Sequence, residues 1–331
     1  MTEVTLLNKK FAFQKESPSY LIKIILIGIL SFGSAVSFGW LLKSFFYSQD
    51  FGVLIWILVF AGVFLVFFVL QTIFVLDSGK SVLFIFIESI ALSIVFLSNS
   101  YYIIPIVLIT FFILWWARHS GKVILENTLK IDFWHISRVV LPKAIMAVVL
   151  VVSIFSPIYL KSKNSNFPFH PAFFDNIISS SKWLIQKFFP EINPDSSIDQ
   201  IARKIAESQI SQSPEANILP RAYKEQIIKQ SSSALYEQIF SFFDIAIDPK
   251  LKPSQILYEG LKSRFVQFSN STKNLIFILI GTLIFISIET FSIPIRIAVS
   301  IIGFLIFKFL IIVGFAKVSI EERPKEVIIM E

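Results

Sequence analysis

The chain has 331 residues, of which 55% are hydrophobic and 16% are charged, and its mean hydropathy is +0.72. Soluble domains carry about 25% charged residues, so this composition excludes an ordinary soluble protein and indicates a polytopic membrane protein. The chain has no cysteine, which excludes disulfides, thiolate zinc sites, iron–sulfur clusters and cysteine nucleophiles. Its net charge is +7, but the sequence contains no arginine-rich tract of the kind that binds nucleic acid.

Five apolar segments within residues 21–160 follow an N-terminal segment of residues 1–20 and are predicted to form a membrane bundle. The segments span residues 21–42, 51–76, 82–97, 101–117 and 139–160. The first is about 22 residues long, which exceeds the apolar part of a cleavable signal peptide and favours an uncleaved anchor. Short polar turns join the second, third and fourth segments, so we expect these helices to be antiparallel neighbours.

Residues 118–138 form the main loop between the fourth and fifth segments. Apolar residues recur there at helical spacing, basic residues lie between or beside them, and Trp134 is a typical anchor at a membrane interface. The pattern predicts a short amphipathic helix that lies on the cytoplasmic membrane surface. A cytoplasmic linker helix packed under the bundle is the alternative interpretation.

Residues 161–272 are the only long polar segment of the chain. They contain 13 Lys or Arg residues against 11 Asp or Glu residues, so their charge is nearly balanced. Ser197 and Gln200 match a capping box, in which a serine precedes a helix and a glutamine follows three residues later. Apolar residues recur at helical spacing, and no alternating strand pattern is present. The sequence therefore predicts an all-α protein with a helical domain inserted after the fifth membrane helix.

Two further membrane helices are predicted within residues 273–316, at 275–288 and 297–315. Pro294 interrupts the apolar pattern between them, and a tail of residues 317–331 follows. The total is about seven transmembrane helices.

The basic residues of the short loops predict the orientation of the chain, because such residues favour the cytoplasmic side. They place the N-terminus in the cytoplasm and, after five crossings, residues 161–272 outside the cell (plasma) membrane. Seven crossings would also place the tail outside, whereas its Lys317, Arg323 and Lys325 favour the inside. A re-entrant last pair of helices, or a miscounted earlier hairpin, would resolve this conflict.

Glu88 is a carboxylate within the apolar third segment. An ionisable group at membrane depth costs roughly 2.5 kcal/mol or more, so it should face other helices or water. One interpretation is a proton or cation site, and the other is a hydrogen-bonded Glu88 that joins helices with the help of Ser81, Ser89 or Ser93. Lys308, within the last segment, is the natural counter-charge, and we state a Glu88–Lys308 ion pair as a hypothesis. The alternative is that the long stem of Lys308 lets its charge reach a membrane interface.

Glu289 and Arg296 flank Pro294 and complete the set of intramembrane charged candidates. They are either ordinary interfacial residues or markers of a broken helix, a feature that forms substrate sites in transporters. The first interpretation is favoured, because the first half of the chain contains no matching break.

No constellation of residues predicts a catalytic, cofactor-binding or metal site. His119, His135 and His170 lack the spacing of metal ligands, and neither a phosphate-cradling glycine loop nor Gly-x-Ser-x-Gly is present. Asp175 and Asp195 are scattered acidic residues whose spacing selects no reaction.

Aromatic residues predict where a partner binds. They crowd the first part of the polar domain, where they form its core, lie against the outer leaflet or contact a partner. The candidate interface residues are Phe173, Phe174, Trp183, Phe188 and Phe189, with Trp134 in the cytoplasmic loop.

By elimination, the first functional prediction is a non-enzymatic envelope protein, a scaffold or assembly factor whose outer helical domain docks a partner protein. The second is a channel or small-solute or ion transporter that uses Glu88 and Lys308. The third is a membrane enzyme acting on lipid-linked envelope precursors. The expected partners are the lipid bilayer and a protein, without nucleic acid or a cofactor.

Overall fold

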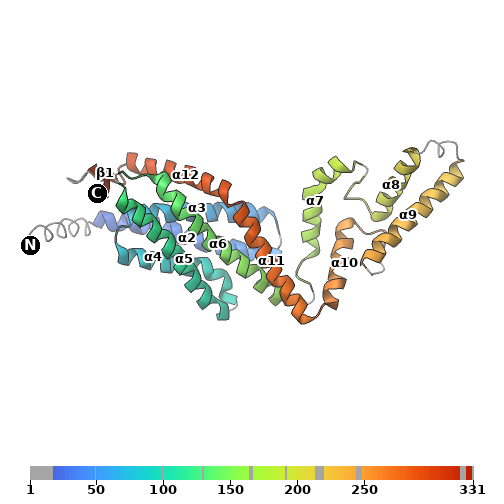
Figure 1. Cartoon of the computed structure of the whole chain (residues 1–331), viewed down its shortest axis with the longest axis horizontal. Helices are drawn as coiled ribbons and strands as arrows, with labels where there is room; N and C mark the ends of the chain where they lie inside the picture. The colour runs from blue at the N-terminus through green and yellow to red at the C-terminus, as the bar shows by residue number, and fades with distance from the viewer. Residues whose placement is uncertain are drawn as a thin grey trace, which may run out of the picture. The chain divides into compact units, whose positions relative to one another are not determined.

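The computed structural model describes residues 18–48, 50–98, 100–128, 130–163, 167–190, 192–212, 220–243, 248–320 and 326–329. These residues divide into two compact units (Figure 1). The first unit, called the bundle below, contains the residues up to Ser48, Gly52–Ile158 and the residues from Ile278 onward. The second, called the helical module, contains Gln49–Phe51 and Tyr159–Phe277.

Within the described ranges, seven helices are long and apolar enough to cross a membrane, which confirms the prediction of an all-α polytopic membrane protein. They are α2 (Pro18–Ser48), α3 (Gly52–Phe74), α4 (Ser78–Ser93), α5 (Ser100–Asn127), α6 (Phe133–Lys163), α11 (Asn270–Thr290) and α12 (Ser292–Ile312). A short 3-10 helix, η1 (Ile94–Ser98), extends α4.

The helix α2 shows how the apolar sequence becomes a packed helix. Its buried residues recur at spacings of three and four, which is the pattern of one face of an α-helix. They include Ile24, Ile27, Ser31, Ser34, Ala35, Phe38 and Leu42. Other large apolar residues of α2, such as Ile22 and Ile29, are exposed. This arrangement suits a helix with one face in the bundle and the other in contact with lipid tails, which are as apolar as leucine.

The predicted amphipathic helix over residues 118–138 does not exist as a separate element. Instead α5 continues to Asn127, and α6 begins at Phe133 after a short connection. The connection ends where the Asp132 carboxylate accepts hydrogen bonds from the backbone N–H groups of Trp134 and His135, which caps the new helix. The apolar residues of this loop were therefore the continuation of one membrane helix and the start of the next.

The last two membrane helices, α11 and α12, lie one after the other along α6. A single residue, Phe291, separates α11 from α12, and Pro294 lies in the first turn of α12, where proline is tolerated. Gly281 lies against Ser153, near the end of α6, whereas Ser300 contacts Ser137, near its start. Both helices therefore run antiparallel to α6 and are arranged end to end.

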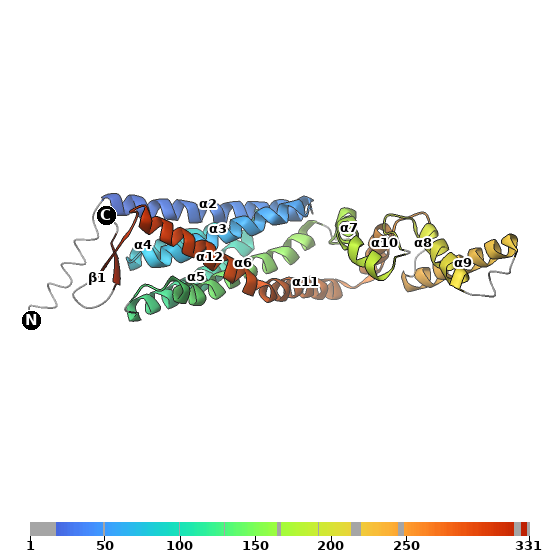
Figure 2. The ribbon, with the colours of Figure 1, turned by 90° about the horizontal axis from the view of Figure 1, so that it is seen from above.

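The end of α12 returns to the start of α2 (Figure 2). The Lys23 ammonium of α2 lies 5.5 Å from the ring centre of Phe315, just beyond α12. After Phe315 a small antiparallel hairpin of β1 (Lys317–Ile320) and β2 (Glu326–Ile329) forms, with Lys317 opposite Ile329. The hairpin is a local addition to a helical protein.

The helical module consists of α7 (Pro171–Phe188), α8 (Ile198–Gln212), α9 (Arg221–Phe243) and α10 (Pro253–Gln267). Its α7 packs against α10 and its α8 against α9. Aromatic rings fill the space around the start of α7: Phe167 lies 5.6 Å from Tyr258 and 5.7 Å from Phe265 between ring centres.

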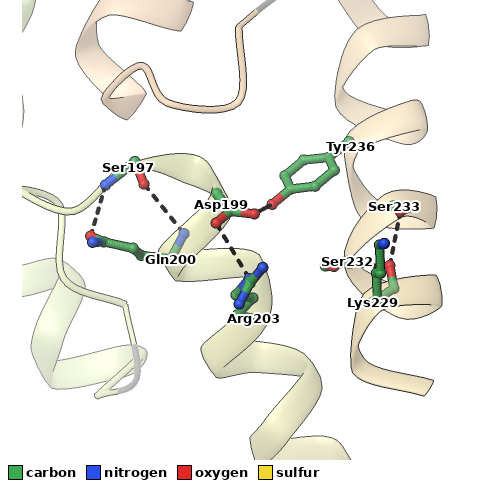
Figure 3. A network of polar contacts seen from close by, with 8 residues as sticks. All are labelled: Ser197, Asp199, Gln200, Arg203, Lys229, Ser232, Ser233 and Tyr236. Carbon is green, nitrogen blue, oxygen red and sulfur yellow. Dashed lines mark hydrogen bonds and ion pairs between the residues drawn. The ribbon is translucent and has the colours of Figure 1, made fainter. Parts of the chain in front are cut away.

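A polar network joins α8 to α9 (Figure 3). The predicted capping box is present, because Ser197 Oγ accepts a hydrogen bond from the Gln200 N–H while Gln200 Oε1 accepts one from the Ser197 N–H. Asp199, in the first turn of α8, accepts a hydrogen bond from the Tyr236 hydroxyl of α9 at 2.5 Å. It also pairs with Arg203 at 3.3 Å. Burial, followed by this hydrogen bond and the Asp199 charge, raises the pKa of Tyr236.

Candidate functional sites

Glu88 lies in α4 and is only 1% exposed. Its Oε1 accepts hydrogen bonds from Ser31 Oγ of α2 at 2.5 Å and from Gln71 Nε2 of α3 at 2.7 Å. Its other oxygen, Oε2, is buried and has no hydrogen-bond partner in the described part of the chain. One carboxylate therefore joins three membrane helices.

Arg118 of α5 supplies the positive charge beside this carboxylate and is also only 1% exposed. Its Nη2 donates to the Gln71 carbonyl at 2.9 Å, and its Nη1 donates to the Ser81 carbonyl at 3.3 Å and to Gln71 Oε1 at 3.4 Å. Across the described residues, Glu88 and Arg118 form no direct ion pair, and Gln71 bridges them. Ser31, Gln71, Glu88 and Arg118 are called the buried charge cluster below.

The buried charge cluster draws one residue from each of α2, α3, α4 and α5. Polar side chains that bond across helices hold membrane bundles together, and an isolated charge in a bundle is costly. Here a carboxylate and a guanidinium balance each other within one set of hydrogen bonds. The geometry favours the interpretation of Glu88 as a residue that joins helices.

The serines expected to assist Glu88 do not do so. Ser89 Oγ donates to the Ile85 carbonyl of its own helix at 2.7 Å, and Ser93 Oγ is buried without a partner among the described atoms. Ser81 contributes only its backbone carbonyl, which accepts from Arg118. The hydrogen bonds that Glu88 Oε1 accepts therefore come from other helices, α2 and α3, and not from the serines of its own helix.

Sequence reasoning missed Arg118 because it follows Trp115 and Trp116, and aromatic residues before a basic one are typical of a membrane interface. Both tryptophans are exposed, but Arg118 points the other way. It shares a buried face of α5 with Leu114, Ala117 and Gly121, at spacings of three and four. That periodicity is visible in the sequence and places an arginine on the inward face.

The hypothesis of a Glu88–Lys308 ion pair is wrong in this structure. Lys308 is exposed on α12, and its ammonium lies 5.7 Å from the ring centre of Phe304. Its long aliphatic stem lets it place the charge away from the bundle. Arg118 takes the position of the counter-charge instead.

Glu289 and Arg296 form the ion pair that their spacing around Pro294 permits. Arg296 Nη2 lies 2.8 Å from Glu289 Oε1 and donates to Ser292 Oγ at 2.7 Å. Because Phe291 is the only residue between the two helices, this pair bridges the junction of α11 and α12. The residues mark a helix junction, and Pro294 belongs to an ordinary helix start.

A cavity of about 640 Å³ opens beside this junction, between the start of α6 and the start of α12. Polar groups on its wall come from both helices, namely His135, Arg138, Arg296 and Ser300, and from Asp132 just before α6. Trp134, predicted to anchor the loop, also lines it and is half-exposed.

The aromatic candidates of the helical module separate into two groups. Phe174 is buried, and Phe173 and Phe174 stack with the rings around Phe167 and Phe169. These two residues belong to the core. Trp183, Phe188 and Phe189 are exposed on the second half of α7 and just beyond it, at 70%, 68% and 60%.

No three His, Cys, Asp or Glu side chains of the described ranges lie close enough together to hold a metal ion. His119 stacks on Trp115, and His170 caps α7 by accepting a hydrogen bond from the Ala172 N–H. Asp195 pairs with Lys182, whose hydrogen bond and charge hold the pKa of the Asp195 carboxyl below its usual range.

The fold and these sites define a multi-pass, all-α membrane protein with a separate helical module. Comparisons of the chain with family models, with curated proteins and with solved structures gave no significant match.

Proposed function

We propose that this protein is a non-enzymatic membrane scaffold or assembly factor of the cell envelope, whose helical module docks a partner protein outside the membrane. The observation that carries the proposal is that the apolar residues of α7 are covered near its start and uncovered further along. Phe174 is buried and packs toward Tyr258 of α10. Ile177, Leu184 and Phe188 share one side of the helix, at spacings of seven and four, and are exposed. An apolar stripe of this kind needs a cover.

The exposed residues in the second half of α7 have the composition of a protein interface. Trp183 and Phe188 are large aromatic side chains of the kind that dominates binding energy at such surfaces. Lys187 lies 5.3 Å from the ring centre of Trp183 and supplies the polar edge. A partner protein with an apolar groove matches this surface.

We propose the following orientation. The basic residues near α2 favour a cytoplasmic N-terminus, so the end of α6 and the helical module lie outside. Because α11 and α12 both run back along α6, the tail returns to the cytoplasmic side, beside Lys23. This arrangement agrees with the basic residues Lys317, Arg323 and Lys325 of the tail.

The absence of cysteine allows a direct test of the orientation. A single cysteine replacing Ser196 in the module should react with a membrane-impermeant maleimide in intact cells. A single cysteine replacing Ser319 in β1 should react only after permeabilisation. Labelling of both cysteines in intact cells would overturn the proposed position of the tail.

The docking proposal is tested by photo-crosslinking in the native cell. A photoreactive residue at Leu184 or Phe188 should capture the same single protein, and the same residue at the exposed Lys204 or Lys229 should not. Phe188→Ser should reduce capture from position 184, because it removes apolar area from the shared face. Adducts of lipid alone at 184 and 188 would assign the face to the outer leaflet and contradict the proposal.

A further inference from the structure

The cavity between α6 and α12 combines basic and apolar groups. Its described lining contains two arginines, one from each helix, Arg138 and Arg296. The hydroxyl groups of Ser137 and Ser300 lie between the helices, 3.2 Å apart. Leu141 and Ile297 supply the apolar part of the wall. Nothing in the proposed docking function uses this cavity.

Both arginines keep hydrogen-bond donors free for an anion. A guanidinium has five N–H donors. Arg138 is exposed and makes no hydrogen bond or ion pair with any described residue. Arg296 bonds Glu289 and Ser292 through Nη2, and its Nε is buried without a partner in the described part.

The acidic residue of the cavity does not neutralise these donors. The Asp132 carboxylate accepts from the N–H groups of Trp134 and His135 at the start of α6. It therefore balances the partial positive charge of that helix end. The cavity presents cationic groups that no described side chain fully satisfies.

The rim of the cavity is apolar and faces outward. Ile293 is 62% exposed and Ile297 is 55% exposed, both on α12, and Trp134 is 45% exposed on α6. In a membrane-spanning bundle such residues contact acyl chains, and tryptophan prefers the headgroup level. A ligand of this cavity thus meets two arginines together with an exposed, lipid-like apolar surface.

We propose that this cavity binds the phosphate group of an anionic lipid, with the acyl chains along Ile293 and Ile297. Arginine pairs with phosphate through two parallel hydrogen bonds, which makes it the preferred residue for such groups. Basic pockets between membrane helices on the cytoplasmic side bind lipid headgroups in this way. The apolar rim selects a lipid over free phosphate.

The proposal is tested with the purified full-length protein by native mass spectrometry. Phosphatidylglycerol should remain bound under conditions that remove phosphatidylcholine, because only the first carries a net negative charge. Millimolar inorganic phosphate should not displace phosphatidylglycerol from the wild type. Displacement by inorganic phosphate would show that the site recognises free phosphate, and equal retention of both lipids would overturn the proposal.

Variants locate the site. Arg138→Gln should weaken phosphatidylglycerol retention about tenfold, as expected for the loss of a charged hydrogen bond. Arg138→Lys should lose less, since it keeps the charge but not the paired geometry. Lys308→Gln is the matched control, because Lys308 is an exposed cation of the same α12 outside the cavity. Equal losses in Arg138→Gln and Lys308→Gln would contradict a specific site.

A measurement on the wild type removes any dependence on variant folding. A photoactivatable phosphatidylglycerol with its reactive group near the headgroup should label peptides that contain residues 132–142 and 293–300. Labelling spread evenly over the exposed faces of α2, α11 and α12 would contradict the proposal.

Discussion

Two acidic residues, Glu88 in the bundle and Asp199 in the helical module, both connect helices, but their surroundings differ. Glu88 is buried, receives hydrogen bonds from two other helices, and reaches its cation Arg118 only through Gln71. The Asp199 side chain is 39% exposed and contacts Arg203 directly, in addition to Tyr236. Water can replace a lost partner of Asp199, whereas it has no access to Glu88.

This difference in burial indicates that polar contacts contribute more to stability in the bundle than in the helical module. In the bundle, lipid and apolar side chains surround the polar groups, so removing one partner leaves a charge that nothing compensates. In the module, solvent screens each pair and reduces its contribution. The predictions below test this contrast, from the largest expected effect to the smallest.

Removing the buried cation should have the largest effect. Arg118→Met leaves Glu88 without a counter-charge and should lower the free energy of unfolding by about 3–5 kcal/mol. The double variant Glu88→Gln with Arg118→Met should recover much of this loss, because both charges are then absent. Unfolding in mixed micelles, followed by tryptophan fluorescence, measures the difference.

Lys308→Met provides the control for Arg118. It removes a cation from an exposed position, so its effect should stay within about 0.5 kcal/mol. Combined with Glu88→Gln it should be additive, because the two residues are not in contact. If Lys308→Met rescued Glu88→Gln, that result would support the Glu88–Lys308 ion pair that the sequence suggested.

The sequence was sufficient for the fold class because the bundle is specified by long apolar segments, and α2 carries its inward face as a regular spacing of residues. It also located Glu88 as the residue under strongest physical constraint. Its partners could not be predicted, because Ser31 lies 57 residues away in the chain and several other serines were equally plausible. Long-range pairing of helices is not encoded in local periodicity.

The path of the last two helices was missed for a different reason. Pro294 interrupts the apolar pattern, and such an interruption looks the same for a reversal as for two helices arranged end to end. Contacts between residues far apart in the sequence, such as Gly281 with Ser153, determine which of the two arrangements forms. The cavity was missed likewise, because Arg138 and Arg296 come together only when α12 runs beside α6.

A substitution at Gly281 tests the close packing of α11 against α6. A Cβ atom at Gly281 would lie 2.7 Å from the Ser153 carbonyl oxygen and 3.1 Å from Pro157 Cγ. Gly281→Ala should therefore cost about 1–3 kcal/mol through overpacking. Gly62→Ala in α3 is the matched control, because a Cβ there meets no atom within 4 Å. It should be neutral or slightly stabilising, since alanine favours helix. Equal effects on unfolding in micelles would show that α11 is not packed on α6.

The third prediction concerns the module network. Tyr236→Phe removes the hydrogen bond to Asp199 and should lower stability by about 1 kcal/mol, because Arg203 and water remain available. The pKa of Tyr236 is raised in the folded state from an ordinary value of 10.0. The tyrosine contribution is therefore complete below pH 10 and is lost as the pH rises above it. Tyr236→Phe should lack this alkaline loss in pH-dependent unfolding, and a parallel decline in both proteins would contradict the assignment.

The smallest effect is expected at the exposed pair of Lys182 and Asp195. Because the lysine holds the Asp195 pKa below 3.8, the stabilisation is present above pH 3.8 and disappears as the pH falls through the folded-state value. Asp195→Asn should thus differ slightly from the wild type at neutral pH and low salt. The difference should vanish in strong acid or in about 0.5 M salt, where the pair is screened. If this substitution destabilised the chain as much as Tyr236→Phe, regardless of salt, solvent would not be screening the module, and the contrast with the bundle would fail.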